Sequence, residues 1–449
     1  MKIRTLMLLL LITVWAVAAS AADEPTHPTL EQVREAIERS DADWIAAETS
    51  VSAQGPEAFN ELIGPADWFG SPDHPPARPP IVPKELPSRF TWDDQDGVNW
   101  ASSVKSQAGC GSCSAFAAAG VIESQIKIGR NDPLLDPDLS EMELFFCNGG
   151  KCDWGSMPWE MLGGLKNNGI PDEACYFYIG NGSDYPCENR CDDWASRIWS
   201  INDYAYVGAG NRDAIKAALL GGPLWSGLLI FEDFQHYRSG VYRHVTGGLS
   251  GGHAVVMVGW DDALGAWRCK NSWGTNWGED GYFWIAYGEA DIDIGAFYVQ
   301  FDPTAACAAR SEPLISALYY NERGSSTQPP TIEDDEELAV YLDYYDAEAD
   351  LAGGYYTVAL DGEEPQRFEE PIGNVGRDYS DSEEYLEVLI GENFSPGEHT
   401  FSVTVFDLCG YSASIDGSFA VAGDDGDDDD GDDDNSADDD DDSDAGCCG

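Results

Sequence analysis

Basic residues are scarce in this chain of 449 residues, in which 24 Lys and Arg stand against 82 Asp and Glu, for a formal net charge of −58. A surface that binds phosphate backbones needs Lys and Arg, so this balance argues against nucleic acid as a partner. Self-repulsion at such a charge favours solubility and is tolerable where salt screens it, so we expect a salty environment.

Long apolar runs are also lacking, apart from one at the N-terminus. Lys2 and Arg4 precede an apolar stretch at residues 6–19, and an A-x-A-like cleavage site follows at residues 19–21. A membrane anchor needs about 20 apolar residues, so this shorter stretch predicts a cleaved secretory signal peptide over residues 1–21. We therefore expect a secreted, extracellular or cell-surface protein without a transmembrane segment. Export also predicts disulfides among the 12 cysteines, although spacing alone does not fix their pairing.

Residues 22–85 have too little pattern for an independent domain. Thr29 and Gln32 form a capping box at the start of one amphipathic helix, and a Pro-rich stretch follows. The apolar face of the helix is expected to consist of Leu30, Val33, Ile37 and Trp44. A lone helix with a loose tail is not stable by itself, so this block must dock on another part of the chain.

Three further blocks follow. Residues 86–303 are dense in Trp, Gly and Cys and form the main globular unit. Within residues 310–422, apolar and other residues alternate at period two in short segments, and Gly, Pro and Asp turns separate these segments. This pattern predicts a small antiparallel β-sandwich of the immunoglobulin type. The sandwich is expected to bind a surface partner or polymer, or to act as a spacer. Asp and Gly dominate residues 423–449, which predicts a disordered tail that serves as a solvated tether rather than a loose Ca²⁺ binder.

The segment from Gln107 to Phe116 contains a candidate nucleophile. A loop precedes Cys113, and apolar residues follow it at helical spacing to about Gly129, which predicts a helix that begins at Cys113. The unpaired N–H groups and the dipole at a helix N-terminus favour an anion, and beside a His the pKa of such a thiol can fall to about 3–4. The resulting thiolate is the form that a nucleophilic cysteine requires.

Cys110 and Cys113 also form a C-x-x-C pair, which is compatible with a redox dithiol or with half of a zinc site. A thioredoxin-like dithiol needs a preceding β-strand, and none is evident. A zinc site needs a second pair, whereas Cys187 and Cys191 are separated by three residues. A third possibility is that both cysteines form disulfides, which we expect of Cys110 but not of Cys113. We therefore expect neither a metal nor a cofactor.

The segment around Cys113 resembles the papain family of cysteine peptidases. His253 follows 140 residues after Cys113, within the distance that the family shows, and Asn271 comes 18 residues later in an Asn-Ser-Trp-Gly motif. The resemblance extends over residues 86–301. It implies a two-lobed α+β fold, with a helical left lobe and a β-barrel-like right lobe, in a secreted precursor of bacterial type.

The resemblance also implies a role for each residue. Cys113 would attack the scissile carbonyl, and His253 would hold the thiolate as an ion pair and later protonate the leaving amine. Asn271 would orient the His253 ring, with Trp273 shielding the bond between them. Gln107 would donate to the oxyanion together with the Cys113 backbone N–H.

Substrate contacts are implied more loosely. Gly155 would offer its backbone to an extended substrate, and Met157, Pro158 and Ala254 would line the pocket for the side chain two before the cut. Ordinary packing is the alternative for Met157 and Pro158. Protein or peptide substrates are the expected partners, and residues 22–85 are expected to inhibit the enzyme until cleavage near residues 84–87.

One position departs from the family signature. Ser114 directly follows the nucleophile, where an aromatic residue is usual, and would leave a gap or admit water. Hydrolysis of peptide bonds by an endopeptidase is the first hypothesis. The same site could instead pass its acyl group to an amine, as a transpeptidase or ligase does. A third possibility is a binding or adhesion scaffold that Ser114 has helped to disarm.

Some disulfides are implied by the same resemblance. It pairs Cys110 with Cys152 and Cys147 with Cys191, with Cys187 as the rival partner of Cys147 and with Cys175 taking whichever of the two remains. The resemblance assigns no partner to Cys269, Cys307 or Cys409.

Overall fold

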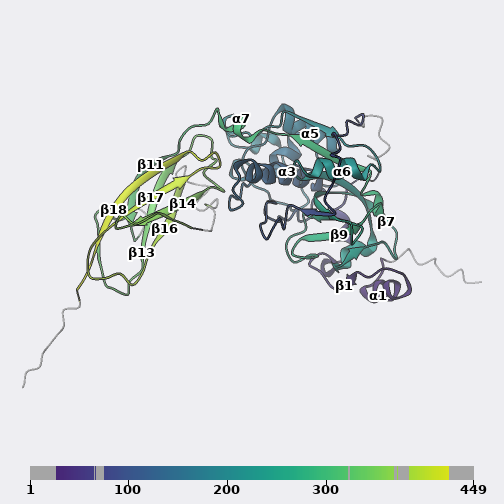
Figure 1. The fold of residues 1–449 in the computed structure, drawn as a ribbon, viewed down its shortest axis with the longest axis horizontal. Helices are drawn as coiled ribbons and strands as arrows, with labels where there is room; N and C mark the ends of the chain where they lie inside the picture. The colour runs from purple at the N-terminus through teal and green to yellow at the C-terminus, as the bar shows by residue number, and fades with distance from the viewer. Residues whose placement is uncertain are drawn as a thin grey trace, which may run out of the picture.

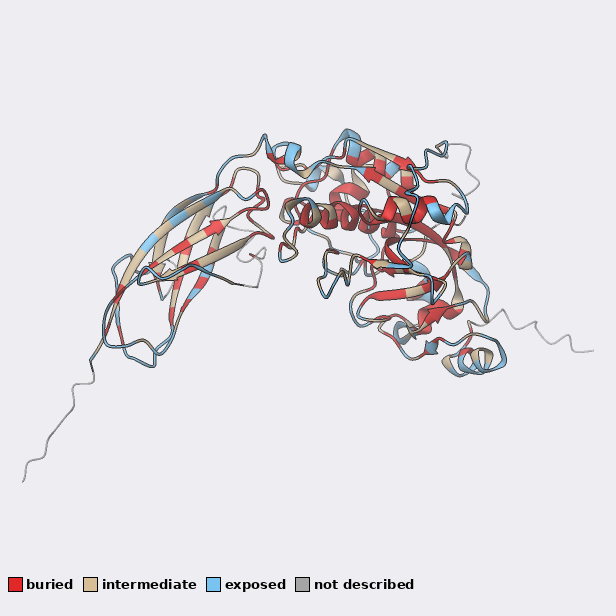
Figure 2. Ribbon diagram, viewed as in Figure 1, coloured by how far each residue is buried: buried red, intermediate tan, exposed pale blue. Residues whose placement is uncertain are grey.

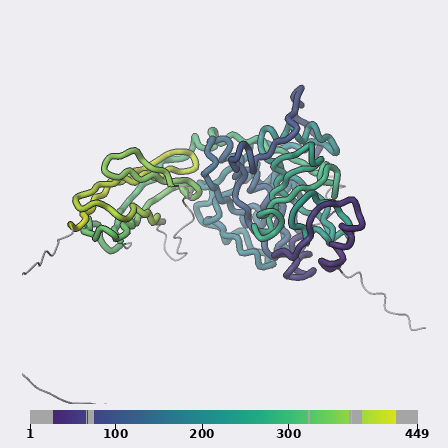
Figure 3. Tube along the Cα trace, turned by 60° about the horizontal axis from the view of Figure 1, so that its bottom comes forward, coloured from purple at the N-terminus to yellow at the C-terminus, as the bar shows by residue number. Residues whose placement is uncertain are grey.

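The computed structural model describes residues 27–64, 66, 75–321, 324–368, 372 and 384–423. The predicted signal peptide and nearly all of the predicted acidic tail lie outside these residues. Figure 1 shows a central unit (residues 86–303) and a C-terminal unit (residues 310–423) beside it. In Figure 3 the N-terminal segment (residues 27–85) runs along the surface of the central unit. Within the described ranges, no helix has both the length and the apolar character needed to cross a membrane.

Seven α-helices are described: α1 (Leu30–Arg39), α2 (Pro56–Glu61), α3 (Cys113–Arg130), α4 (Glu141–Phe146), α5 (Pro158–Asn167), α6 (Arg212–Leu219) and α7 (Pro303–Cys307). The strands up to residue 303 are β1 (Ile45–Ala46), β2 (Arg89–Thr91), β3 (Asp203–Tyr206), β4 (Leu224–Phe231), β5 (Tyr237–Ser239), β6 (Val241–Tyr242), β7 (Leu249–Asp261), β8 (Ala266–Lys270), β9 (Tyr282–Ala286) and β10 (Gly295–Gln300). The strands of the C-terminal unit are β11 (Leu314–Tyr320), β12 (Thr331–Ile332), β13 (Leu338–Tyr345), β14 (Tyr355–Leu360), β15 (Gln366–Arg367), β16 (Glu384–Gly391), β17 (Gly397–Phe406) and β18 (Ser412–Val421).

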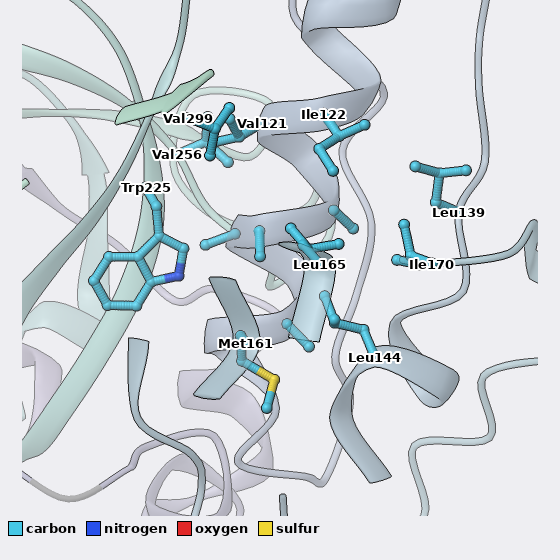
Figure 4. Close-up of a cluster of buried hydrophobic side chains, with 14 of the residues drawn as sticks. Val121, Ile122, Leu139, Leu144, Met161, Leu165, Ile170, Trp225, Val256 and Val299 are labelled. Carbon is cyan, nitrogen blue, oxygen red and sulfur yellow. The ribbon is translucent and has the colours of Figure 1, made fainter. Parts of the chain in front are cut away.

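Helix α3 forms the centre of the central unit. It is buried over most of its length, and it ends as predicted, with Asn131 in the left-handed conformation (φ 52°) at the C-cap. Helices α4 and α5 pack on one side of it and strand β7 on another. Figure 4 shows the apolar core around α3, where Leu144 and Leu165 approach from the helices and Trp225 from the sheet.

Eight strands form the sheet of the central unit, in the order β3-β10-β4-β7-β8-β9-β6, with β2 paired to β7. Strand β7 is the longest and pairs with β4 so that His253 lies opposite Leu228. A second apolar core lies within this sheet region, and Figure 2 shows burial concentrated in α3 and the neighbouring strands. The expected α+β class, with a helical lobe and a β-rich lobe, is confirmed.

The N-terminal segment begins as predicted and then differs from the prediction. Helix α1 carries both hydrogen bonds of the Thr29 capping box. The placement of Trp44 on its apolar face is wrong, because α1 ends at Arg39 and Trp44 packs instead against the rings of Tyr237 and Tyr242. Strand β1 and helix α2 were not predicted, and β1 pairs with β5 of the central unit.

The C-terminal unit consists of two sheets. One has the order β11-β13-β16 and the other β12-β18-β17-β14-β15. Apolar residues alternate at period two around positions 338–342, 356–360, 386–390 and 401–405, and these positions lie on strands β13, β14, β16 and β17, whose apolar residues share one core. The arrangement is not purely antiparallel, because the short strand β12 pairs with β18 in parallel.

Four disulfides are formed within the described residues: Cys110–Cys152, Cys147–Cys187, Cys175–Cys191 and Cys307–Cys409. The first confirms the expectation, whereas the preferred pairing of Cys147 with Cys191 is wrong and its rival is correct. The reason is local, since the Cys191 backbone N–H donates to the Cys175 carbonyl (2.9 Å) and this contact places the two residues side by side. Cys307–Cys409 links the central and C-terminal units, and Cys269 is a buried free thiol.

Candidate active site

Cys113 lies where the sequence predicted, as the first residue of α3. Its thiol is free and buried, whereas Cys110 is bonded to Cys152, so a dithiol or a zinc half-site at the C-x-x-C pair is excluded in this structure. The backbone N–H of Ala254, the residue after His253, donates to the thiol. The helix N-terminus and strand β7 therefore meet at the candidate nucleophile.

His253 and Asn271 meet on the neighbouring strands. His253 Nε2 lies 2.7 Å from Asn271 Oδ1, and Asn271 directly follows strand β8. Because an amide oxygen only accepts, His253 Nε2 must carry the proton, which leaves Nδ1 as the basic atom. His253 Nδ1 is buried and has no hydrogen-bond partner. The Trp273 ring covers the pair, with its centroid 4.9 Å from that of His253.

Cys113 and His253 are both neutral in this arrangement. Burial raises the pKa of Cys113 to about 11, against the opposing effect of the Ala254 backbone N–H. Burial likewise lowers the pKa of His253 to about 4, although its bond to Asn271 and the Leu62 carbonyl oppose the shift. The expected thiolate–imidazolium pair is therefore not formed here, because desolvation outweighs the helix N-terminus when the N-terminal segment covers the site.

Gln107 holds the peptide carbonyl that also lies beside His253. Its Nε2 donates to the Leu62 carbonyl (3.0 Å) and to the Cys110 carbonyl (2.8 Å). Its Oε1 accepts from Ser272 Oγ at 2.7 Å, which fixes the orientation of the amide. A side-chain donor with this placement can stabilise negative charge on a carbonyl oxygen.

The N-terminal segment occupies the groove on both sides of this carbonyl. Gly64 and Gly252 exchange two backbone hydrogen bonds, of 2.8 and 2.9 Å. Phe59 is fully buried and meets the Trp273 ring edge-on, with the centroids 5.9 Å apart. A cavity of about 390 Å³ remains between α2 and the central unit. The groove is therefore occupied by the last turn of helix α2 and by the chain that leaves it, as far as Gly64.

The predicted substrate-binding residues differ in how clearly they contact the groove or the nucleophile. Gly155 lies close to Gly64, since a Cβ built on Gly64 would be 4.0 Å from Gly155 Cα and 3.8 Å from the Gly252 carbonyl oxygen. Ala254 is buried next to the nucleophile. Pro158 is the first residue of α5 and Met157 is its N-cap. Met157 packs against the core of the central unit, and this position suits a pocket wall and ordinary packing equally.

Three residues at the site were missed from the sequence. They are Phe59 and Leu62, which hold the N-terminal segment in the groove, and Ser272, which orients Gln107. A signal for the first two was present, because Pro56 after a glycine is typical of the first position of a helix and precedes both apolar residues. No local pattern marks Ser272.

Ser114, the departure from the expected motif, is only 2% exposed. The position after the nucleophile is thus closed to bulk solvent, although its Oγ has no hydrogen-bond partner. Trp225 from β4 donates its indole N–H to the Ser114 carbonyl at 3.0 Å. The Trp225 ring of strand β4 therefore supports the first turn of helix α3.

Known sequences resemble the N-terminal and central parts of the chain. The family model described as "Papain family cysteine protease" matches residues 86–300. A "Gut-specific cysteine proteinase" of Caenorhabditis elegans is 31% identical over 242 residues, which are 47% of this chain and 71% of that protein. "Cathepsin B-like CP3" of Giardia intestinalis is 36% identical over 193 residues, which are 40% of this chain and 63% of that protein. These relatives are eukaryotic, so the bacterial type stays a prediction.

Solved structures share the fold. The structure titled "proCathepsin B S9 from Trypanosoma congolense" has a TM-score of 0.52 and 24% identity, and covers 62% of this chain and 99% of its own. Digestive procathepsin L 3 of the Tenebrio molitor larval midgut has a TM-score of 0.50 and 24% identity, and covers 61% of this chain and 88% of its own. Both likenesses concern the fold alone, and the family match ends before the C-terminal unit begins.

Proposed function

Because this chain belongs to the papain family of cysteine proteases, we propose that it is a secreted endopeptidase that uses Cys113, His253 and Asn271 to hydrolyse peptide bonds. The observation that carries the proposal is the peptide carbonyl of Leu62, held 3.0 Å from Gln107 Nε2 and beside His253. A substrate carbonyl placed there would have its oxygen at a donor and would lie next to the proposed base.

The chemistry follows from the protonation states of the site. Once the groove opens, water and the helix N-terminus favour transfer of the thiol proton of Cys113 to His253 Nδ1. The thiolate then attacks the carbonyl carbon, and the C–N bond breaks as His253 returns the proton to the leaving amine. The thioester that remains is hydrolysed when water gives a proton to His253 and attacks the same carbon. The bond between that carbon and Cys113 Sγ then breaks, which releases the carboxylic acid product and restores the thiolate beside protonated His253. Asn271 fixes the tautomer throughout, because its Oδ1 accepts only from a protonated Nε2.

The N-terminal segment is proposed to inhibit the enzyme. It fills the groove from Phe59 to Gly64, so a substrate cannot enter while it is bound. Residues 84–87 are exposed or half-buried and lie outside helices and strands, which suits cleavage by a protease. The proposal also divides the chain into a peptidase domain at residues 86–303 and a β-sandwich domain at residues 310–422.

The C-terminal unit is proposed to hold the enzyme on a surface or a polymer outside the cell. Leu314 and Tyr345 are paired across β11 and β13, and both are exposed. Exposed apolar and aromatic side chains on a rigid sheet offer contact area at low entropic cost.

Substitution of the nucleophile tests the proposed reaction. Cys113→Ala, processed in the same way as the wild type, should hydrolyse no peptide of a mixed library detected by mass spectrometry. Cys269→Ala is the matched control, because Cys269 is the other buried free thiol and is expected to leave hydrolysis intact. Turnover near the wild-type rate in Cys113→Ala would refute the assignment. Incubation with an amine acceptor separates hydrolysis from acyl transfer by the mass of the products.

A further inference from the structure

An acidic cluster lies in the C-terminal unit where that unit faces the central unit. Asp346, Glu348 and Asp350 alternate along the loop between β13 and β14, and one oxygen from each lies within 4.8 Å of the others. Asp407, directly after β17, also brings an oxygen within 4.8 Å of Asp350. Figure 1 shows this end of the C-terminal unit facing the region of α7.

Two of these carboxylates are buried with unsatisfied oxygens. Asp350 and Asp407 are each 1% exposed, and neither Asp350 Oδ1 nor Asp407 Oδ2 accepts a hydrogen bond. The other oxygen of Asp407 accepts from the Tyr411 backbone N–H at 2.8 Å. Asp350 Oδ2 has an ion pair with Arg310 Nη1 at 3.3 Å but no hydrogen bond. Buried carboxylate oxygens without a donor are costly, so each points to a missing partner.

The charges of the cluster do not balance without a cation. Asp346, Asp350 and Asp407 are all buried and carry three negative charges when ionised, and Arg310 supplies one positive charge. Two negative charges remain, which is the complement of one divalent cation. Glu348 is half-buried at the rim, where it accepts from the Ser311 hydroxyl at 2.7 Å.

The ligand chemistry favours calcium. Ca²⁺ binds carboxylate and carbonyl oxygens at about 2.3–2.6 Å in flexible geometry, and oxygens that lie within 4.8 Å of one another can share such an ion. Mg²⁺ demands near-ideal octahedral geometry and keeps several waters, which suits a buried all-protein cluster less well. Acidic residues at every second position of a loop are also typical of Ca²⁺ sites. Cys409 Sγ lies near the same oxygens but is bonded to Cys307, so it is not a ligand.

Asp350 and Asp407 are buried, have unsatisfied oxygens and lie within 4.8 Å of each other, and Asp346 and Glu348 each bring an oxygen within 4.8 Å of Asp350. We therefore propose that one Ca²⁺ ion binds around Asp350, with Asp407 and Asp346 as further ligands and Glu348 at the rim. Asp346 also accepts from the backbone N–H groups of Glu348 and Leu351, which fix its carboxylate in place. This site contrasts with the sequence-based expectation of no metal. The ion would join the loop after β13 to the loop after β17. Arg310 lies against Asp350 and also donates to the Ile198 carbonyl at 3.0 Å, so the same ion would brace the contact with the central unit.

The test measures thermal unfolding of the full chain in chelator-treated buffer, with and without millimolar CaCl₂. The wild-type transition of the C-terminal unit should rise by roughly 5 °C or more with CaCl₂ and by less with MgCl₂. Asp350→Asn and Asp407→Asn should abolish that rise. The acidic tail is present in every variant, so loose binding there cancels in the comparison. Glu363→Gln, an exposed acidic position in the same unit, is the matched control and should behave as wild type.

A second readout separates a metal site from a structural role of the carboxylates. In Ca²⁺-free buffer, Asp407→Asn should be at least as stable as the wild type, because Asp407 is buried and has no ion-pair partner among the described residues, whereas Asp350→Asn would also leave Arg310 unpaired. A lower transition temperature of Asp407→Asn than of the wild type in that buffer would show that this carboxylate stabilises the fold without a cation and would overturn the proposal. Equal shifts in wild type and Asp350→Asn, or no shift in the wild type, would overturn it as well. An equal wild-type response to MgCl₂ would overturn the assignment to calcium.

Discussion

Phe59 should anchor the N-terminal segment in the groove, and its removal should release inhibition. Its ring is fully buried and contacts the edge of Trp273, the residue that covers His253 and Asn271. Burial of a phenylalanine stabilises by about 2–3 kcal/mol, and an aromatic pair adds about 0.5–1.5 kcal/mol. A loss of about 3 kcal/mol corresponds to a binding constant weakened by roughly 150-fold.

The assay compares inhibition of the processed enzyme by peptides that span residues 27–64. The inhibition constant of the Phe59→Ala peptide should rise by roughly 50- to 500-fold over that of the wild-type peptide. Asn60→Ala is the matched control, because Asn60 is the exposed neighbour of Phe59 on α2 and its replacement leaves the buried face unchanged.

A change of less than about fivefold for Phe59→Ala would refute this reasoning, since it would mean that the buried ring adds no more than about 1 kcal/mol to binding. Equal losses for Phe59→Ala and Asn60→Ala would also contradict it. That outcome would attribute the effect to the stability of helix α2 rather than to the contact with Trp273.

Three further predictions concern the same site. Asn271→Ala should lower kcat by roughly 10- to 100-fold with little change in KM, as is usual when the partner that orients a functional His is lost, and the kcat/KM split checks it. Inhibition by the 27–64 peptide should change little between pH 7 and pH 5, because the covered site holds one proton on the Cys113 thiol and the uncovered site holds the same proton on His253. Inhibition constants at pH 7, 6 and 5 test this, and a steep weakening toward pH 5 would contradict the transfer of that proton. Gly251→Ala should weaken inhibition more than tenfold, since its Cβ would lie 2.5 Å from Ile63 Cγ2 and 2.6 Å from the Gly64 carbonyl oxygen. Gly64→Ala is the control, because a Cβ at that position has no contact under 3.8 Å. Equal inhibition constants for the two variants would contradict the prediction.

The parts of the structure that depend on local sequence were predictable. Helix α3 was placed to within a residue at both ends, because a loop precedes Cys113 and a left-handed Asn131 follows Arg130. The meeting of His253 with Asn271 was implied by the family resemblance, and the structure brings the two side chains to 2.7 Å. In both cases the decisive residues lie within one element or one motif.

Features that depend on distant partners were missed. Strand β1 has only two residues, too few for an alternating pattern, and exists because β5 offers it an edge. Trp44 looked like part of a helical face, but its position is set by Tyr237 and Tyr242 of the central unit. The pairing of Cys147 likewise depends on which backbone lies beside Cys175.

The protonation state of the nucleophile shows the same limit of local reasoning. A cysteine at a helix N-terminus near a histidine has every local reason to ionise. The N-terminal segment, about 50 residues earlier in the chain, removes the solvent that an ion pair needs, and the pKa of Cys113 rises to about 11 instead. In the proposed precursor, covering the groove would therefore act in two ways, because it would exclude substrate and keep the thiol protonated.

The central and C-terminal units are less independent than their separate sequence patterns suggested. Most of the C-terminal core consists of its own alternating strands, but Leu408 and Cys409 pack in the core around α3. The Arg310 guanidinium lies 3.9 Å from the centre of the Trp199 ring, so the residue at the expected boundary is itself a contact. The disulfide Cys307–Cys409 then holds the two units together even if those contacts open. A boundary drawn at residue 310 separates two patterns of sequence, whereas the structure places a covalent link and shared apolar packing across it.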